Sequence, residues 1–321
     1  MIVKSKQTPP LILKLQALSS RILPHHIKHS FIKDDLARYL AGFKGEKSIE
    51  YYLSFLPDEE YYIFHDIRLF DGEHFFQLDA LILTKRLFCI LEIKNLAGII
   101  EFDKDFNQII QIKNGQEKAY PDPTTQLQRQ KSQLNTWLKR NNLPQLPMQG
   151  FVVFSNPQTV IKSNDKFTKN IVIKNHTLSS KISDLQDLQE HQKTDILTQK
   201  DIKRIIRIVM KLDTPLDNSI IEQYQLSRGD IVKGVFCEVC KHIPLQRIHG
   251  YWYCSHCTIK SKDAHLAALK DYQLLFGELI TSNQLKEFLQ INCSSLATRI
   301  LKSVSSSMEG EKKGRVYTLT K

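Results

Sequence analysis

Asp79, Glu92 and Lys94 are charged residues in apolar surroundings. Asp79 interrupts the run FFQLDALIL (75–83), and the other two lie near the end of LFCILEIKN (87–95). Burying a lone charge costs several kcal/mol, so these side chains need partners or a chemical task. Two carboxylates can bind a divalent cation and an ammonium group can stabilise charge developing on a phosphate, so this set suits phosphodiester hydrolysis.

The two runs are predicted to be neighbouring antiparallel strands joined by a short Lys85-Arg86 link. This pairing places Asp79 opposite Glu92, and two carboxylates that face each other across a ladder can share a cation. We expect Asp79 and Glu92 to bind Mg²⁺ or Mn²⁺, with a backbone carbonyl near Ile93 as a third ligand. Side chains two apart on a strand share a face, so Lys94 lies beside Glu92 and can orient or deprotonate the attacking water.

Two further residues are expected to support this set. Glu46, on a helix before the sheet, is placed to complete the metal shell or hold a second ion. Gln126, in the first turn of a helix opened by Asp122-Pro123, is placed to hydrogen-bond the lysine or the phosphate. The spacing of the acids and the lysine also arises by chance, and Glu92 and Lys94 would then form an ion pair at a strand end.

The surrounding pattern predicts an α/β core with a mixed sheet. We expect helices over residues 10–23 and 45–56, three strands over 61–69, 74–84 and 87–95, and a hairpin over 99–115. A helix from 123 to about 140 and a buried strand over 149–156 follow.

Residues 42–156 resemble the nuclease-related domain (NERD) family, a branch of the restriction-endonuclease-like PD-(D/E)xK superfamily. The matching segments come in the family's order: GFKGEKSIEYYL, HDIRL, FFQLDALIL, FCILEIKNLAG, YPDPTTQLQRQ and FVVFSN. The resemblance implies a restriction-endonuclease-like mixed sheet flanked by helices and metal-dependent nuclease activity. It supports the site residues Glu46, Asp79, Glu92, Lys94 and Gln126. Ala80 stands where many members have histidine, which puts one secondary contact in doubt.

Four cysteines form two knuckles, Cys237-x2-Cys240 and Cys254-x2-Cys257. Two such knuckles complete a tetrahedron of thiolates, so we predict a structural Zn²⁺ site in a small zinc ribbon. Redox use of the pairs is the weaker alternative. The ribbon either touches nucleic acid or stabilises a domain junction, and the sequence leaves both open.

The C-terminal segment reads as helix, turn, helix and basic hairpin, an α+β tail that resembles a winged helix. Its outward basic residues are predicted to contact nucleic acid: Arg299, Lys302, Lys312, Lys313 and Arg315. A plain helical cap with a solvated basic tail is the alternative.

Composition and charge set the class of protein. The 321 residues carry a net charge of +11, and an acidic block over 31–110 (nine basic, fifteen acidic residues) lies between basic ones. This distribution suits a metal site flanked by surfaces that bind a polyanion. No apolar run reaches the roughly 18 residues that a membrane span needs, so we expect a cytoplasmic protein.

We therefore predict five segments with nucleic acid, specifically DNA, as the partner. They are an N-terminal helical extension (1–30), the nuclease-related domain (31–180), a helical connector (181–232), the zinc ribbon (233–262) and a winged-helix-like domain (263–321). The alternatives are a catalytically silent DNA-binding protein that keeps the nuclease fold and an RNA-directed nuclease.

Overall fold

The computed structural model describes residues 1–190, 197–311 and 314–320. The chain forms two compact units, each assembled from two stretches of sequence. The first consists of Met1–Gln7 and Leu40–Leu216, and the second of Thr8–Tyr39 and Asp217–Lys321. Helix α2 (His29–Leu53) contributes residues to both units. The five predicted segment boundaries stay predictions.

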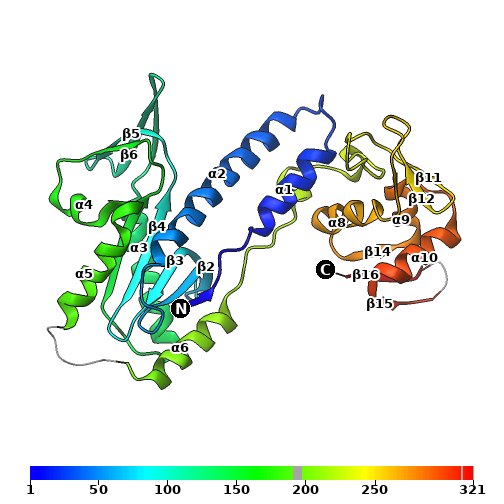
Figure 1. Ribbon diagram of the computed structural model, residues 1–321. Helices are drawn as coiled ribbons and strands as arrows, with labels where there is room; N and C mark the ends of the chain where they lie inside the picture. Colours follow the sequence, from blue (N-terminus) through cyan, green and yellow to red (C-terminus); the bar gives the residue numbers. More distant parts are fainter. Residues whose placement is uncertain (191–196, 312–313, 321) are drawn as a thin grey trace. The chain divides into compact units, whose positions relative to one another are not determined.

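The first unit is built on a six-stranded mixed sheet in the order β1-β2-β3-β4-β8-β10 (Figure 1). Strands β2, β3 and β4 pair antiparallel, whereas β1 runs parallel to β2, and β8 runs parallel to both β4 and β10. The strands are β1 (Ile2–Lys4), β2 (Tyr62–Phe70), β3 (Phe75–Leu83), β4 (Phe88–Lys94), β8 (Met148–Phe154) and β10 (Val172–Lys174).

A smaller sheet in the same unit has the order β7-β6-β5-β9. Its strands are β5 (Gly98–Asp103), β6 (Gln108–Lys113), β7 (Gln116–Pro121) and β9 (Thr159–Lys162). The β5–β6 hairpin was predicted from the sequence, but β7 was not. The pattern misses β7 because QEKAYP is polar and largely exposed, and it is held by ladder pairing with β6 rather than by burial.

Helices cover both faces of the large sheet. The C-terminal part of α2 (Ile49, Leu53) and α5 (Leu178–Glu190) pack on one face, and α3 (Pro123–Arg140) and α6 (Gln199–Leu212) on the other. The short α4 (Lys166–Ile171) and a 3₁₀ turn (Asn175–Thr177) complete the unit. The predicted mixed α/β core is therefore confirmed. Helix α2 begins much earlier than the predicted residue 45, because the side chains of residues 29–44, apart from Ile32, are not buried and form no apolar stripe.

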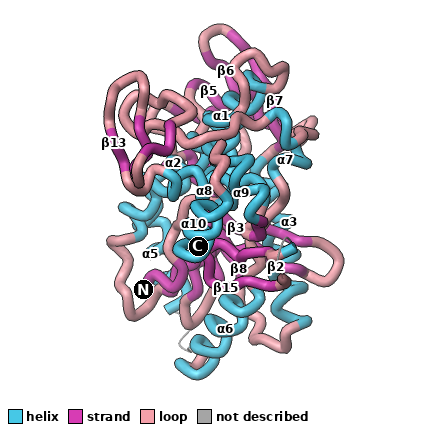
Figure 2. The backbone as a smooth tube through the Cα atoms, turned by 90° about the vertical axis from the view of Figure 1, so that its right-hand side faces the viewer, coloured by secondary structure: helices cyan, strands magenta, loops and turns pink. Residues whose placement is uncertain are grey.

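The second unit has a single hydrophobic core. It contains Leu15 and Leu18 of α1 (Pro10–Arg21), Trp252 of the small cysteine-bearing sheet, and Leu285 and Leu301 of the C-terminal segment. The other elements are α7 (Ile220–Gln223), a 3₁₀ turn (Arg228–Asp230), β11 (Gln246–Ile248), β12 (Tyr251–Tyr253) and β13 (Lys260–Ser261). Figure 2 shows the same backbone from the side, coloured by type of element.

The C-terminal segment of this unit alternates helices and strands. Its elements are α8 (His265–Phe276), β14 (Leu279–Thr281), α9 (Ser282–Leu289), α10 (Ser294–Val304), β15 (Ser305–Glu309) and β16 (Val316–Leu319). The strands form an antiparallel sheet in the order β14-β16-β15. The predicted capping box at Thr281 and Gln284 opens α9. The sequence predicted the two helices α9 and α10 and the hairpin after them, but not α8 and β14. The winged-helix assignment stays a prediction.

Candidate functional site

The β3–β4 ladder brings Asp79 and Glu92 together. The register pairs Ala80 with Leu91, so Asp79 and Glu92 are the next residues along it, as the sequence predicted. The Oδ2 atom of Asp79 accepts a hydrogen bond of 2.8 Å from the backbone N–H of Ile93. This bond fixes the Asp79 carboxylate against the end of β4.

Glu92 is a buried carboxylate, 2% exposed, and both of its oxygens have donors. Lys94 Nζ donates to Oε1 at 2.6 Å, and Gln130 Nε2 of α3 donates to Oε2 at 2.7 Å. Lys94 also donates to Gln126 Oε1 at 3.1 Å. The structure therefore joins Glu92, Lys94 and Gln126 in one hydrogen-bonded chain and adds Gln130, which the sequence analysis missed. Its signal was the four-residue spacing from Gln126, which places both amides on one face of a helix.

Glu46 reaches the site from α2 because Gly45 lets the helix approach the strand ends. A Cβ atom at Gly45 would lie 2.5 Å from Cβ of Asn95, just beyond β4. The Glu46 carboxylate is paired with Lys6, and Lys6 also donates to Asp66 Oδ2 at 2.6 Å. Glu46, which was predicted to support the metal shell, is thus already paired with the ammonium group of Lys6.

Lys6 is a site residue that sequence reasoning did not find. Its side chain has no exposed surface, and Phe43 lies 5.8 Å from its Nζ atom. Burial alone lowers the pKa of Lys6, but the carboxylates of Glu46 and Asp66 outweigh that effect and the pKa is raised. Residues 1–30 contain no acidic residue, but nothing in the local sequence places Lys6 beside Glu46, forty residues later.

The acids influence each other strongly. Burial raises the pKa of Asp79 well above its usual range, and the carboxylates of Glu92 and Glu46 raise it further. The Ile93 N–H and the Lys94 ammonium act in the opposite direction. Repulsion of this kind is relieved by a shared cation, and carboxylate oxygens are the donors that Mg²⁺ and Mn²⁺ prefer. By donor type and charge, Asp79 and Glu92 fit such an ion.

His65 of β2 is another titratable group buried in this sheet. It pairs across the β2–β3 ladder with Ala80, and its buried Nε2 atom has no hydrogen-bond partner among the residues that the structure describes. Burial, and then the nearby ammonium of Lys6, lower the pKa of His65 to about 4. The imidazole is therefore neutral at physiological pH.

In the second unit, the four cysteines converge. Their Sγ atoms all lie within 4.8 Å of one another, with 3.5 Å between Cys237 and Cys257 and between Cys240 and Cys254. A tetrahedral Zn²⁺ with Zn–S bonds of about 2.3 Å separates its sulfurs by about 3.8 Å, so the cluster matches zinc. Hydrogen bonds, first from the backbone of Cys240, lower the pKa of Cys237 to about 6, which favours the thiolate.

Within the described part of the chain, these cysteines are the only group of three or more metal-binding side chains whose ligand atoms converge in this way. The carboxylates of the first unit are instead engaged by Lys6, Lys94 and Gln130. The two candidate metal sites therefore differ in how far they are assembled.

One comparison with known proteins matches part of the first unit. Residues 41–155 match the family described as "Nuclease-related domain" (NERD). This part of the chain is a nuclease-related domain. The match contains Glu46, Asp79, Glu92, Lys94 and Gln126 and confirms the resemblance drawn from the sequence, whereas Lys6 and the cysteine cluster lie outside it. No similar protein was found among curated proteins, and no similar chain among solved structures.

The predicted nucleic-acid contacts of the second unit are partly described. Arg299 and Lys302 lie exposed on α10, and Arg315 is half-buried just before β16. Lys312 and Lys313 lie outside the described residues. Arg247 of β11 lies 5.1 Å from the Trp252 ring; burial lowers the pKa of this guanidinium, and the charge of Arg299 lowers it further. The ribbon and α10 thus contribute neighbouring positive charges.

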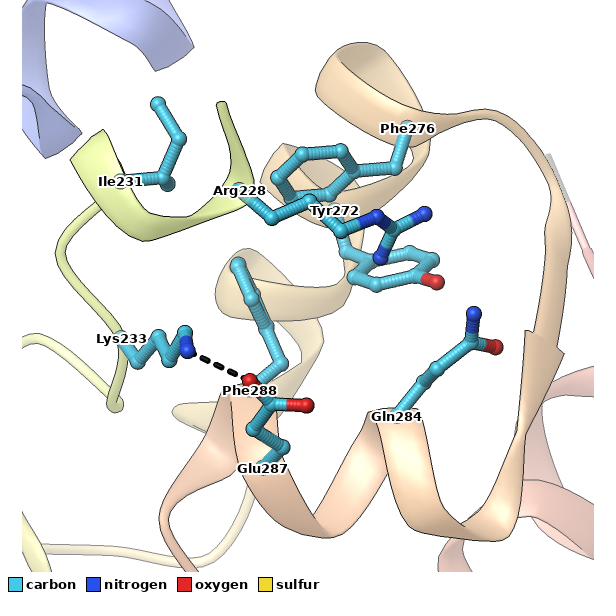
Figure 3. Close-up of a pocket in the computed structure, with 8 residues that line it drawn as sticks. All are labelled: Arg228, Ile231, Lys233, Tyr272, Phe276, Gln284, Glu287 and Phe288. Carbon is cyan, nitrogen blue, oxygen red and sulfur yellow. Dashed lines mark hydrogen bonds and ion pairs between the residues drawn. The ribbon is translucent and has the colours of Figure 1, made fainter. Parts of the chain in front are cut away.

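A hollow of about 20 Å³ in the second unit has room for little more than a water molecule (Figure 3). The Arg228 guanidinium lies 4.4 Å from the Phe276 ring, and Lys233 Nζ lies 2.5 Å from Glu287 Oε1. These contacts fix the 3₁₀ turn and the following segment against α8 and α9, and the hollow is too small for a substrate.

Proposed function

We propose that the chain is a metal-dependent nuclease that hydrolyses phosphodiester bonds of DNA. The observation that carries this proposal is the buried Glu92 carboxylate, held between Lys94 and Gln130 beside Asp79, whose pKa is raised. A structural core has little use for two repelling carboxylates at a strand end. The match to a nuclease-related domain supports the same reading.

Each residue has a role in this mechanism. Asp79 and Glu92 would hold Mg²⁺ or Mn²⁺, which would supply a Lewis acid for the scissile phosphate and lower the pKa of a bound water. Lys94 orients the attacking water and offsets the charge that develops on the phosphoryl oxygens. Gln126 and Gln130 fix the positions of Lys94 and Glu92 through the bonds of 3.1 and 2.7 Å. Glu46 adds negative charge that strengthens cation binding.

The second unit is proposed to bring DNA to this centre. Its C-terminal elements have the order of a winged helix, whose second helix binds the major groove. Arg299 and Lys302 lie exposed on α10, which corresponds to that helix. The four-cysteine cluster is proposed to hold a structural Zn²⁺. We place the protein in the cytoplasm, where such thiols stay reduced. Among the described residues, no helix is long and apolar enough to cross a membrane.

A second candidate function is DNA binding without turnover. It is favoured by the ion pair of 2.6 Å between Lys94 and Glu92, in which the ammonium already neutralises one metal-binding carboxylate. The two candidates make the same prediction for binding and opposite predictions for cleavage.

A cleavage assay separates them. Purified protein is incubated with plasmid, linear duplex, single-stranded DNA and RNA in Mg²⁺ or Mn²⁺, beside Glu92→Gln and Lys94→Ala. We expect each variant to lose about 10²–10³-fold in rate, because charge stabilisation at the phosphate is lost. Glu101→Gln and Lys162→Ala are matched controls, since this ion pair of 2.8 Å lies outside the site. If wild type and variants cleave none of the substrates but still bind DNA, the chain is a DNA-binding protein without nuclease activity. If only RNA is cleaved, the substrate is RNA and not DNA.

A further inference from the structure

The β6–β7 hairpin, residues 108–121 and here called the arm, lies with β5 in the segment between β4 and α3, and both of these elements carry residues of the carboxylate site. The chain leaves the site at Lys94, the last residue of β4, and enters β5 at Gly98. After β7 it reaches Asp122, which caps α3, the helix that carries Gln126. The arm and β5 thus connect two elements of the site, β4 and α3.

Contacts with the link that follows Lys94 hold β6 near the turn of the arm. Gln111 Nε2 donates to the backbone carbonyl of Ala97 at 2.7 Å, in the short link between β4 and β5. Gly98 has a φ of +90°, and a Cβ atom there would lie 2.4 Å from the carbonyl oxygen of Ile112. The link that follows Lys94 therefore touches β6 directly, and the arm cannot swing away from the site without breaking these contacts.

The two faces of the arm differ in charge. Successive side chains on a strand point to opposite faces, and the register pairs Gln111 with Lys118 and Lys113 with Gln116. One face therefore carries two lysines and no acid: Ile109, Gln111, Lys113, Gln116, Lys118 and Tyr120. The other face carries Glu117 opposite Ile112.

The lysine face lies on the same side as the site. At its base, Ile109 is buried in the core that contains Leu127 and Leu134 of α3. The same helix supplies Gln130 to Glu92. Toward the tip of the arm, the side chains of this face become exposed. Its lysines therefore extend into solvent on the side of the sheet where the substrate phosphate is proposed to bind.

Within the described residues, the two lysines of this face have no carboxylate partner, and the arm is braced by side-chain and turn contacts. Lys113 and Lys118 are exposed, and no carboxylate in the described part of the chain lies within ion-pair distance of either. Lys118 Nζ lies 5.2 Å from the ring of Tyr120, whose hydroxyl donates to Gln111 Oε1 at 3.2 Å. The turn has positive φ at Asn114 (53°) and Gly115 (74°), as in the tight two-residue hairpins that match strand twist. Figures 1 and 2 both show the hairpin projecting from its unit.

We propose that the lysine face of the arm binds the sugar–phosphate backbone of the nucleic acid next to the bond that is cleaved. The inference rests on the proposed function, because it names the surface that guides substrate into the carboxylate site. The two surfaces are complementary in charge, because two ammonium groups without carboxylate partners, on a face without acids, would contact the phosphates of a polyanion. Such contacts do not depend on the base sequence.

Site-specific cross-linking in the full-length protein tests this placement. A photoreactive phenylalanine analogue replaces Gln116 in one protein and Glu117 in another, so that adjacent positions probe opposite faces. Labelled duplex and single-stranded DNA are then irradiated with each protein in Ca²⁺, which supports binding while slowing hydrolysis. We expect cross-links at least fivefold stronger from position 116. Equal or stronger cross-linking from position 117, or none from either while DNA is bound, would overturn the proposal.

Removal of the two lysines gives an independent measure. The double variant Lys113→Ala, Lys118→Ala should weaken DNA binding about tenfold near 0.15 M salt and lower the slope of log K against log salt by about two. If cleavage occurs, KM should rise with kcat almost unchanged, because the lysines act on ground state and transition state alike. Lys162→Ala, a lysine of the same sheet that already has a partner, is the matched control and should change neither quantity.

The outcomes separate this inference from the proposed function. Cross-linking from position 116 in a protein that cleaves nothing would retain the arm as a binding surface and refute the nuclease proposal. Cleavage by wild type with no effect of the lysine variants and no cross-link from position 116 would refute the arm and retain the nuclease.

Discussion

The two candidate metal sites differ in how much of the protein each needs. The cysteine site draws all four ligands from 21 consecutive residues, Cys237 to Cys257, and its sulfurs already lie within 4.8 Å of one another. The carboxylate site takes Asp79, Glu92 and Glu46 from two strands and a helix, and two of these acids are paired with lysines. In this protein the thiolate site is specified by local spacing, whereas the carboxylate site depends on elements distant in the sequence.

The difference also concerns what happens without metal. Among the described residues, no ammonium group is paired with the cysteine cluster, so removing Zn²⁺ leaves thiolates to repel one another or take up protons. In the carboxylate site, Lys6 and Lys94 already offset much of the negative charge. We therefore expect metal to be essential for the folding of the ribbon and dispensable for the folding of the nuclease-related domain.

The largest expected effect follows from breaking the cysteine site. Cys237→Ser combined with Cys257→Ser should abolish stoichiometric zinc, measured by elemental analysis, and unfold β11 to β13. Structural zinc contributes about 10 kcal/mol or more to small modules, so a clear loss of thermal stability is expected. Cys293→Ser is the control, because that thiol is exposed and lies outside the cluster. Retention of one zinc per chain in the double variant would contradict the assignment.

The same contrast explains what could be read from the sequence. The register of Asp79 and Glu92 followed from two apolar runs and a short turn, and the zinc knuckles from their spacing alone. Gln126 was predicted because its helix opens with a visible cap at Asp122. Lys6 was beyond such reasoning, since its contacts with Glu46 and Asp66 join residues 40 and 60 positions apart. Strand β7 was missed because ladder pairing, not an apolar pattern, holds it.

An intermediate effect is expected from removing the ammonium group that compensates the carboxylates of the first unit. Lys6→Met keeps the length of the side chain but leaves Glu46 and Asp66 facing each other without a cation. Breaking a buried ion pair on one side typically costs about 3 kcal/mol or more, which should appear as a lower urea midpoint with an unchanged slope. Mg²⁺ should restore part of the lost stability in the variant, because Glu46 and Asp66, no longer paired with Lys6, can then bind the ion.

Lys44→Met serves as its control, since this exposed lysine lies on the same helix, two residues before Glu46. Equal stability of the Lys6 and Lys44 variants would mean that the Lys6 pairs add nothing to the domain. It would also weaken the contrast between the two sites, because the carboxylates would then tolerate the absence of any cation.

The smallest expected effect is the dependence of the stability of the nuclease-related domain on pH, which we attribute to His65. The pKa of His65 falls to about 4 in the folded state, below its ordinary value of 6.5. Between these values the unfolded chain binds the additional proton, so the stability of the nuclease-related domain should be complete above pH 6.5 and decline as the pH falls toward 4. The gap corresponds to a loss of about 2 kcal/mol at pH 5 for this residue.

His65→Leu, which places an apolar side chain beside Ala80, should lack this component in urea unfolding measured at pH 7.5 and pH 5. His176→Leu, at a site where the imidazole is not buried, should keep it. An identical pH dependence in wild type and His65→Leu would show that His65 does not control the acid stability of this domain.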